Sequence, residues 1–263
     1  MGDESDIVLS EDGRRLRPVK SLMRALDLVQ ALAESRRPLG VTELASLTSS
    51  SKTAAYNLVT TLEIRGLVRR DSHNRYALGW ALFELGELVR TGSDLSDAAR
   101  PVVADLAEST GETALLGVLN HDSVIYIQKA ESRRSIRMVE APGQRLPLHK
   151  TAAGLVLLAF ASDTYRDRYL MTVTTQAETS RSHLRDATQE IVARGYAVFV
   201  QEPDPDLTSA SVPVFGYGGE VSAALTVAGP VSRLTRARIE EFLPQILSSA
   251  DSISSSIGGR RPS

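Results

Sequence analysis

The residues at positions 49–66, SSSKTAAYNLVTTLEIRG, combine an apolar helical stripe with a strip of hydrogen-bonding side chains. Ala55, Leu58, Val59 and Leu62 recur at intervals of three and four, which is the spacing of a helix that buries one face. Gly66 is the type of residue expected just past the end of such a helix. The opposite face carries the polar side chains of Lys52, Thr53, Tyr56, Asn57 and Thr60.

These side chains are of the types that contact nucleic acid. Lys, Ser and Thr bind phosphate oxygens, an Asn amide pairs with the edge of adenine, and a Tyr ring can contact the methyl group of thymine. The sequence therefore predicts a helix that enters the major groove of DNA with its N-terminal residues against the bases. Thr42 and Ser51, which precede the polar face, are further candidate DNA contacts. The alternative is the solvated polar face of an ordinary small helical module.

Two more helices and a hairpin are expected to position this helix. Residues 21–35 predict an amphipathic helix with Ser21 as its N-cap and with Leu22 and Leu26 on the buried stripe, and residues 41–49 predict a second helix with Thr42 as its N-cap. The pattern LVRRDSHNRYALG then predicts two short strands around a turn at positions 71–74. Together these elements form a winged helix-turn-helix, whose wing would bring three arginines to the flanking DNA: Arg69, Arg70 and Arg75.

Charge is distributed unevenly along the chain. Residues 17–80 hold ten basic and five acidic residues, a net charge of +5, and because the whole chain carries −2, the remainder carries −7. A basic N-terminal region beside an acidic remainder favours an anionic partner for the former. Double-stranded DNA is the predicted partner, and a winged helix that contacts another protein is the alternative.

Beyond the hairpin the pattern changes to that of a larger, mixed domain. Residues 80–91 predict an amphipathic helix that joins two modules, and from Asp94 onward helices and strands are interspersed without strict alternation. That pattern is typical of an α+β sensor-like domain. We expect a disordered arm over residues 1–16, the winged helix over 17–79, the linker helix over 80–93, an effector domain over 94–258 and a tail over 259–263. A strand is also expected at 135–139.

The ordered set of segments resembles a known family. The stretch from SLMRALDLV to NRYALG, followed by LPLHKTAAGLVLLAF, RGYAV, SASVPVF and LTVAGPVSRLT, is similar to the IclR-type bacterial transcriptional regulators over nearly everything from Ser21 to Phe242. The resemblance implies a winged helix-turn-helix, a linker helix that helps to dimerise, and a C-terminal GAF-like α/β domain that binds a small-molecule effector, commonly an organic acid. It also implies a homodimer or tetramer.

One departure from the family concerns the predicted recognition helix. Family members often read Lys-Ser-Thr-Val-His-Arg there, whereas the His and Arg positions of this chain are Tyr56 and Asn57. The operator sequence of relatives therefore does not carry over.

The segment LPLHKTAAG is the first candidate for effector binding. It places His149, Thr151, Ala152 and Gly154 at a predicted strand-to-helix junction. Free backbone N–H groups at a helix start favour an anion, and small residues let it approach closely. In the family this segment borders the effector pocket, so a carboxylate-bearing effector is expected. The alternative is a structural helix cap with His149 on the surface.

The resemblance implies further pocket walls in the strand after RGYAV and in the last two strands. A relative that binds a small oxo-acid has Asp, Cys, Ser and Ser at the polar positions of these walls. By alignment this chain has Phe199, Ser209, Thr226 and Ala228 there, with Leu207 on the same wall. The resulting pocket is more apolar, which suits an acid with an aromatic or branched apolar body. The alternative is that Phe199 fills the pocket as core.

The composition excludes several kinds of chemistry. The chain has no cysteine, which excludes disulfides, thiolate catalysis and thiolate metal sites. Its four histidines are not spaced with acidic residues as metal ligands, and no nucleophile elbow or phosphate-binding loop occurs. We therefore expect no catalytic residue, metal or cofactor, and an enzyme is the least favoured interpretation. Neither a secretory signal nor a membrane-length apolar run is visible, so a cytoplasmic protein without a membrane partner is expected.

Overall fold

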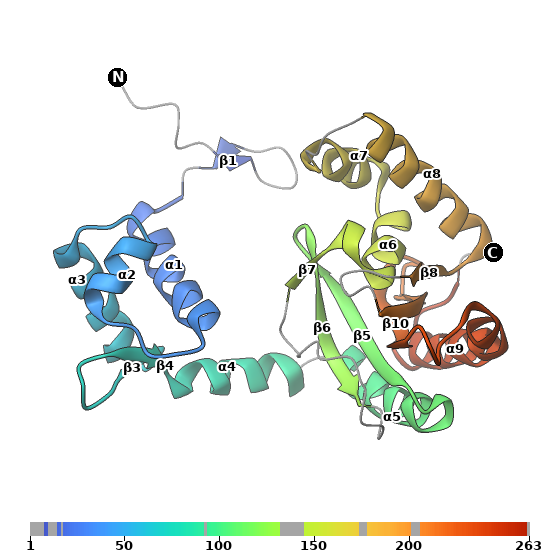
Figure 1. Cartoon of the computed structure of the whole chain (residues 1–263), viewed down its shortest axis with the longest axis horizontal. Coiled ribbons are helices and arrows are strands. Elements are labelled where there is room, and N and C mark those ends of the chain that lie inside the picture. The colour runs from blue at the N-terminus through green and yellow to red at the C-terminus, as the bar shows by residue number, and fades with distance from the viewer. Residues whose placement is uncertain are drawn as a thin grey trace. The chain divides into compact units, whose positions relative to one another are not determined.

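The chain separates into two compact units, residues 1–89 and 90–263 (Figure 1). The computed structural model describes residues 8–9, 15–16, 18–91, 94–131, 145–173, 178–200 and 206–261. The division between the units falls within the helix that the sequence predicts as a linker. Of the predicted disordered arm, the described part consists of β1 (Val8–Leu9) and β2 (Arg15–Leu16), which pair with each other. The strand expected at 135–139 and most of the arm lie outside the described residues.

The N-terminal unit is a bundle of three helices with a hairpin. Its elements are α1 (Lys20–Ser35), α2 (Val41–Leu47), α3 (Lys52–Ile64), β3 (Val68–Arg70), β4 (Tyr76–Leu78) and then α4 (Trp80–Thr91). Leu28, Leu44, Val59 and Tyr76 are buried together, one from each of the three helices and one from the hairpin. Gly66 takes a φ of 70° at the end of α3, as predicted. This arrangement confirms the predicted winged helix-turn-helix.

The predicted N-caps of the first two helices are wrong. α1 begins one residue before Ser21, and the residue preceding it is Val19, which has no side-chain acceptor. α2 begins before Thr42, because Gly40 stands at the N-cap position and the Glu43 carboxylate accepts the Gly40 N–H bond at 2.8 Å. The Glu43 carboxylate thus binds the N–H group of the N-cap residue, whereas an N-cap Thr42 would have accepted an N–H bond from further along the helix.

The buried side of α1 also differs from prediction. Leu28 and Leu32 are 0% and 3% exposed, whereas Leu22 and Leu26 are 58% and 54% exposed. Apolar residues cover much of this helix, and the bundle contacts the side that carries Leu28. The two leucines that the stripe placed inside therefore remain on the surface of the single chain.

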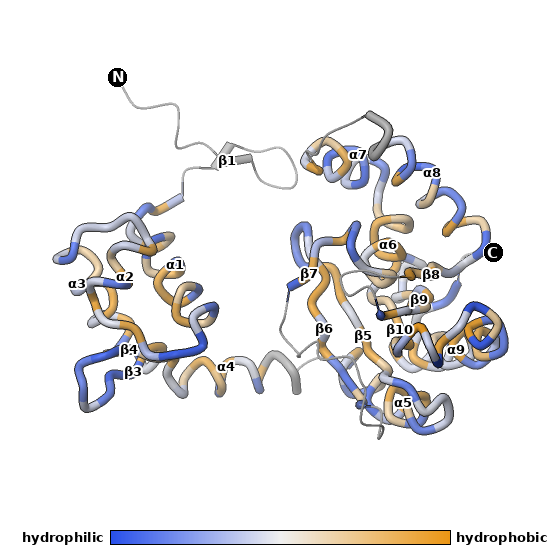
Figure 2. The backbone as a smooth tube through the Cα atoms, viewed as in Figure 1, coloured by the Kyte–Doolittle hydropathy of each residue, from blue (hydrophilic) through white to orange (hydrophobic). Residues whose placement is uncertain are grey.

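The C-terminal unit is built on a six-stranded sheet whose neighbouring strands all run antiparallel. In spatial order the strands are β7 (Arg145–Pro147), β6 (Ser123–Ala130), β5 (Thr113–Asn120), β10 (Val221–Pro230), β9 (Leu207–Phe215) and β8 (Ala197–Val200). One face packs against α5 (Asp94–Thr110) and α9 (Arg236–Ser256), and the other against the short helix η2 (Leu148–Lys150) and α6 (Ala152–Ala159). Figure 2 shows α6 as apolar throughout. The predicted α+β class is confirmed.

One helix of this unit, α7 (Asp163–Thr172), is not predicted by the sequence. Its residues, DTYRDRYLMT, are mostly polar, and only Tyr169 and Leu170 are buried, so no periodic apolar stripe marks it. Ser162 caps it by accepting the Tyr165 N–H bond at 3.2 Å. α8 (Glu178–Arg194) follows and packs on α6. Within the described part of the chain, no helix combines the length and the apolarity needed to cross a bilayer.

Candidate DNA-binding face and effector-binding face

The polar face of α3 is exposed along its first two turns. Ser51 caps the helix, since its hydroxyl oxygen accepts the Ala54 N–H bond at 3.2 Å. Lys52, Thr53, Tyr56 and Asn57 are exposed, and Thr60 is half-buried. The buried stripe of Ala55, Val59 and Leu62 faces the bundle and fixes the direction of these side chains.

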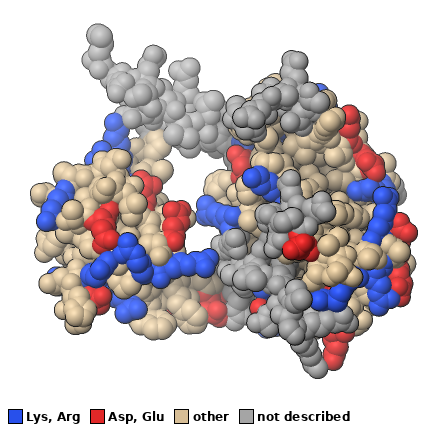
Figure 3. Space-filling model, viewed as in Figure 1, with Lys and Arg blue, Asp and Glu red and all other residues tan. Residues whose placement is uncertain are grey.

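Thr42 lies apart from α3, on the first turn of α2, where it is exposed. Figure 3 shows basic side chains over the N-terminal unit with acidic ones among them. The structure thus places most of the candidate DNA contacts on one helix and Thr42 on the preceding one, as in a helix-turn-helix.

The three arginines of the wing differ in their hydrogen bonds and ion pairs. Arg69 and Arg70 are exposed, and their Nε atoms lie 3.3 Å from the Leu78 carbonyl oxygen and 3.5 Å from the Glu63 carboxylate, respectively. Arg75 donates from Nε to the Pro38 carbonyl oxygen at 3.1 Å and from Nη2 to Glu43 at 3.1 Å.

Arg75 therefore joins the wing to α2 instead of extending from the surface as predicted. Arg37 also donates to Glu43, at 2.9 Å. The Gly40 N–H bond and then the two guanidinium groups lower the pKa of Glu43 below its ordinary value. Glu43 is thus the anionic centre of a junction between wing and bundle.

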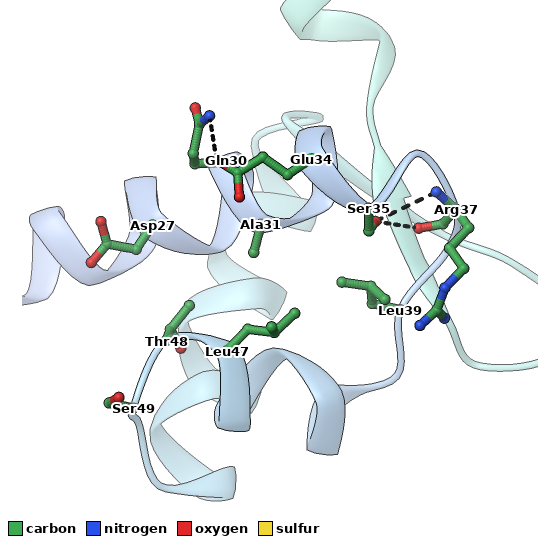
Figure 4. A pocket seen from close by; sticks show the side chains of 10 residues that line it. All are labelled: Asp27, Gln30, Ala31, Glu34, Ser35, Arg37, Leu39, Leu47, Thr48 and Ser49. Carbon is green, nitrogen blue, oxygen red and sulfur yellow. Dashed lines mark hydrogen bonds between the residues drawn. The ribbon is translucent and has the colours of Figure 1, made fainter.

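A groove of about 680 Å³ opens beside this junction, between α1 and the turn after α2 (Figure 4). Asp27, Glu34 and Arg37 lie around it, with Leu39 and Leu47 as apolar lining. None of the predicted DNA contacts lines this groove. Its mixed charge favours no particular ligand.

The predicted pocket walls of the C-terminal unit share one face of the sheet. One row of cross-strand neighbours runs over four strands: Phe199, Ser209, Ala228 and Thr113. A second row on the same face is formed by Ala197, Ser211, Thr226 and Leu115. We call this the effector-binding face, after the role that the sequence predicts for it.

Two hydroxyl-bearing members of this face, Ser211 and Thr113, were not predicted. Ser211 and Thr226 hydroxyl oxygens lie 2.9 Å apart and are hydrogen-bonded, and Ser211 also donates to the Leu225 carbonyl oxygen. Thr113 is buried in the row of Phe199. Strand alternation would have revealed Ser211 and Thr113 had the strand register been known. Leu207, opposite Pro230 at the end of β9, packs against the same cluster as Phe199.

The strand-to-helix junction lies against this face and is held by its own side chains. Thr151 caps α6 by accepting the Gly154 N–H bond at 2.9 Å. A Cβ atom at Gly154 would lie 2.2 Å from the Leu148 carbonyl oxygen, so the backbone of η2 by itself requires glycine there. Ala152 is buried with the rest of α6. The junction is therefore closely packed, and its small residues serve the contact between η2 and α6.

His149 is bound to α7. The Tyr169 hydroxyl oxygen lies 2.8 Å from His149 Nδ1 and accepts the His149 N–H bond at 3.2 Å. Burial raises the pKa of Tyr169, which keeps its hydroxyl protonated. α7, which the sequence does not predict, thus fixes the start of the segment that is predicted to bind the effector. Among the described residues, no three His, Asp or Glu side chains are grouped as a metal site requires.

Together the two units define a class of protein: a winged-helix DNA-binding domain joined to a ligand-binding α/β domain. Comparison with known proteins gives the family. Residues 21–72 match the IclR helix-turn-helix domain, and residues 88–255 match the C-terminal domain of the bacterial transcriptional regulator IclR. The chain belongs to the IclR family of DNA-binding transcriptional regulators and is not an enzyme.

Individual relatives agree. The chain is 32% identical to the HTH-type transcriptional regulator BhcR of Paracoccus denitrificans, over 92% of this chain and 89% of the relative, and 32% identical to the regulator KdgR of Escherichia coli, over 91% and 93%. Its fold matches the crystal structure of an IclR transcriptional regulator from Alicyclobacillus acidocaldarius with a TM-score of 0.79 at 28% identity, covering 92% and 100% of the two chains. An IclR homologue from Microbacterium hydrocarbonoxydans, crystallised with 4-hydroxybenzoate, shares the fold at 22% identity (TM-score 0.76), covering 90% and 98%.

Proposed function

We propose that this regulator binds its operator through the exposed face of α3. An organic acid with an apolar or aromatic body binds the effector-binding face and either weakens or strengthens the affinity for the operator. The DNA-binding part rests on one observation, the exposure of Lys52, Tyr56 and Asn57. The buried stripe on the same helix directs these side chains to the surface. In this proposal residues 17–79 bind DNA, residues 80–93 link and residues 94–258 bind the effector. The protein acts in the cytoplasm, where its DNA is.

A homodimer, alone or paired into a tetramer, is the proposed assembly. Four apolar side chains of α4 are more than half exposed in the single chain: Trp80, Phe83, Leu85 and Leu88. Figure 2 shows hydrophobic residues along this helix. Burying them against the same helix of a second copy would remove this apolar surface from water. Two recognition helices on one duplex would add their phosphate contacts and require a near-palindromic operator.

The effector class rests on the lining of the effector-binding face. Phe199, Leu207 and Ala228 give it an apolar character, and Ser209 and Thr226 supply hydroxyl groups. The 4-hydroxybenzoate bound to the Microbacterium homologue is an acid of this kind. For control of DNA binding, the acid must prefer one arrangement of the two winged helices over the other.

Fluorescence anisotropy with the DNA upstream of the protein's own gene tests both parts. We expect specific binding that weakens as salt rises and that one acid of an aromatic and aliphatic panel changes. Specific binding that ignores every acid would contradict the effector part alone. Absence of specific binding would contradict the operator part.

A further inference from the structure

A lysine is buried on the effector-binding face. The side chain of Lys129, on β6, is only 7% exposed. Enclosing an ammonium group in protein is unfavourable unless an anion compensates it. A lysine at such a position therefore points to an anion that belongs there.

A β-bulge is what turns Lys129 toward this face. Val124 and Tyr126 face the cluster around α6, and strict alternation from them would send residue 129 to the opposite face. Between Gly117↔Tyr126 and Leu116↔Gln128, however, β6 contains one extra residue, Ile127, which reverses the alternation. Lys129 lies opposite Leu115 and so shares the face of that residue.

This position brings Lys129 into the second row of the effector-binding face. The row runs from Lys129 through Leu115 and Thr226 to Ser211. Strands lie about 4.8 Å apart, so the Cα atom of Thr226 is roughly 10 Å from that of Lys129. An acid that contacts both the lysine ammonium group and the Thr226 hydroxyl group would cross Leu115, which lies between them in the row.

One anion beside Lys129 is Glu131. Its Oε1 atom lies 3.1 Å from Lys129 Nζ, and its side chain is 47% exposed. The ion pair is therefore asymmetric: the cation is enclosed and the carboxylate reaches water. Losing the pair costs a half-exposed carboxylate little, because water solvates it in place of the lysine.

Another ion pair of this unit shows what a structural pair looks like. Glu112 is 5% exposed at its side chain, and Arg233 donates to both of its carboxylate oxygens at 2.7 Å. There the carboxylate is enclosed and held by two bonds, so no second anion could replace it without leaving a buried charge. The Lys129–Glu131 pair has the opposite arrangement.

We propose that Lys129 binds the carboxylate of the effector and that Glu131 is a counter-ion which the effector displaces. The inference rests on the proposed function, since it assumes an acid on the effector-binding face. It makes Lys129 the residue that selects acids over neutral molecules of the same shape, while Phe199 and its neighbours select the apolar body. Glu131 would weaken acid binding by competing with the ligand.

Isothermal titration calorimetry on the full-length protein tests this. The probes are 4-hydroxybenzoate, benzoate, phenylacetate and isovalerate, each paired with its primary amide. Lys129→Met should weaken acid binding by about tenfold or more, as expected for a lost charge-assisted hydrogen bond, and leave amide binding nearly unchanged. Lys129→Arg should retain part of the preference for acids. Arg236→Met, which removes an exposed basic side chain from α9, away from the effector-binding face, is the control.

Glu131→Gln provides a second, independent test, because this variant retains Lys129. It should strengthen acid binding several-fold and leave amide binding unchanged, because the competing carboxylate is gone. Equal acid binding by wild type and by folded Lys129→Met would overturn the inference while the proposed function stands, as would weaker acid binding by Glu131→Gln. If wild type binds no acid of the panel, the proposed effector class fails and the inference fails with it.

Discussion

The two candidate sites of this protein are built in opposite ways. On α3, the candidate side chains extend into solvent from a helix whose other face is buried with the bundle. On the effector-binding face, the candidates are strand residues enclosed beneath α6, whose every residue is buried. Side chains of an exposed site can be replaced without loss of the fold. In an enclosed site, a substitution that changes binding also changes the packing and therefore the stability.

Gly154→Ala should destabilise the C-terminal unit most. The new Cβ atom would lie 2.2 Å from the Leu148 carbonyl oxygen, and because this oxygen belongs to the backbone, the contact forces η2 and α6 apart. Overpacking of this kind costs about 1–3 kcal/mol. Chemical denaturation followed by circular dichroism measures it, with Gly86→Ala, at an open position on α4, as the control. Equal stability of wild type and Gly154→Ala would show that the junction is loose.

Asn57→Ala and Tyr56→Ala should leave stability unchanged and relax operator discrimination. Each should lose about 1–3 kcal/mol of preference for the operator if it contacts a base. Competition binding between operator and scrambled DNA measures the loss. Unchanged discrimination in both variants would remove α3 as the recognition helix.

Phe199→Asp should change which acids the protein binds. A carboxylate in the row of Ser209 and Ala228 makes this end of the effector-binding face polar, so smaller and more polar acids should gain over aromatic ones by roughly tenfold. Calorimetric competition between benzoate and a small oxo-acid is the measurement. An unchanged order of preference, with the fold retained, would assign Phe199 to the core.

Arg70→Ala and Arg75→Ala should separate a DNA contact from an internal one. Arg70 is exposed, and its loss should lower the slope of log K against log salt by about 1. Arg75 is bound to Pro38 and Glu43, so its loss should leave the salt slope nearly unchanged and instead lower the melting temperature of the N-terminal unit. The reverse result would mean that Arg75 is the residue that binds phosphate.

Glu43→Gln should show the smallest effect, and only as a change in pH dependence. Folding lowers the pKa of Glu43, so its carboxylate stabilises the fold above its ordinary titration range, and that contribution is lost as the pH falls through the lowered value. The melting temperature of the wild type should therefore fall more steeply on acidification than that of Glu43→Gln. Glu34→Gln, at an exposed position on α1, should behave as the wild type.

The sequence predicts the exposed site better than the enclosed one, for a physical reason. A helix repeats every 3.6 residues, so Ala55, Val59 and Leu62 alone determine where Tyr56 and Asn57 point. For a strand, orientation depends on register, and one extra residue such as Ile127 reverses every side chain beyond it. Lys129 and Ser211 escaped prediction for this reason.

Two further errors have local causes. The polar helix α7 has no apolar stripe to mark it, although its Tyr169 holds His149. The N-cap of α2 could not be assigned from Thr42, because the helix begins at Val41 and the Glu43 carboxylate binds the N-cap N–H group of Gly40 from inside the helix. Periodicity thus predicts the elements that bury a face, and it does not reveal those that are positioned by individual contacts.

The single tryptophan of the chain has a practical consequence. Trp80 is 73% exposed on α4 and meets only the edge-on ring of Phe83 among the ring contacts of the described residues, with the centroids 6.3 Å apart. If α4 pairs with its copy, the indole ring leaves water, and its emission would move to shorter wavelength. The protein would then report its own assembly by intrinsic fluorescence, without any label, in every titration with DNA or acid.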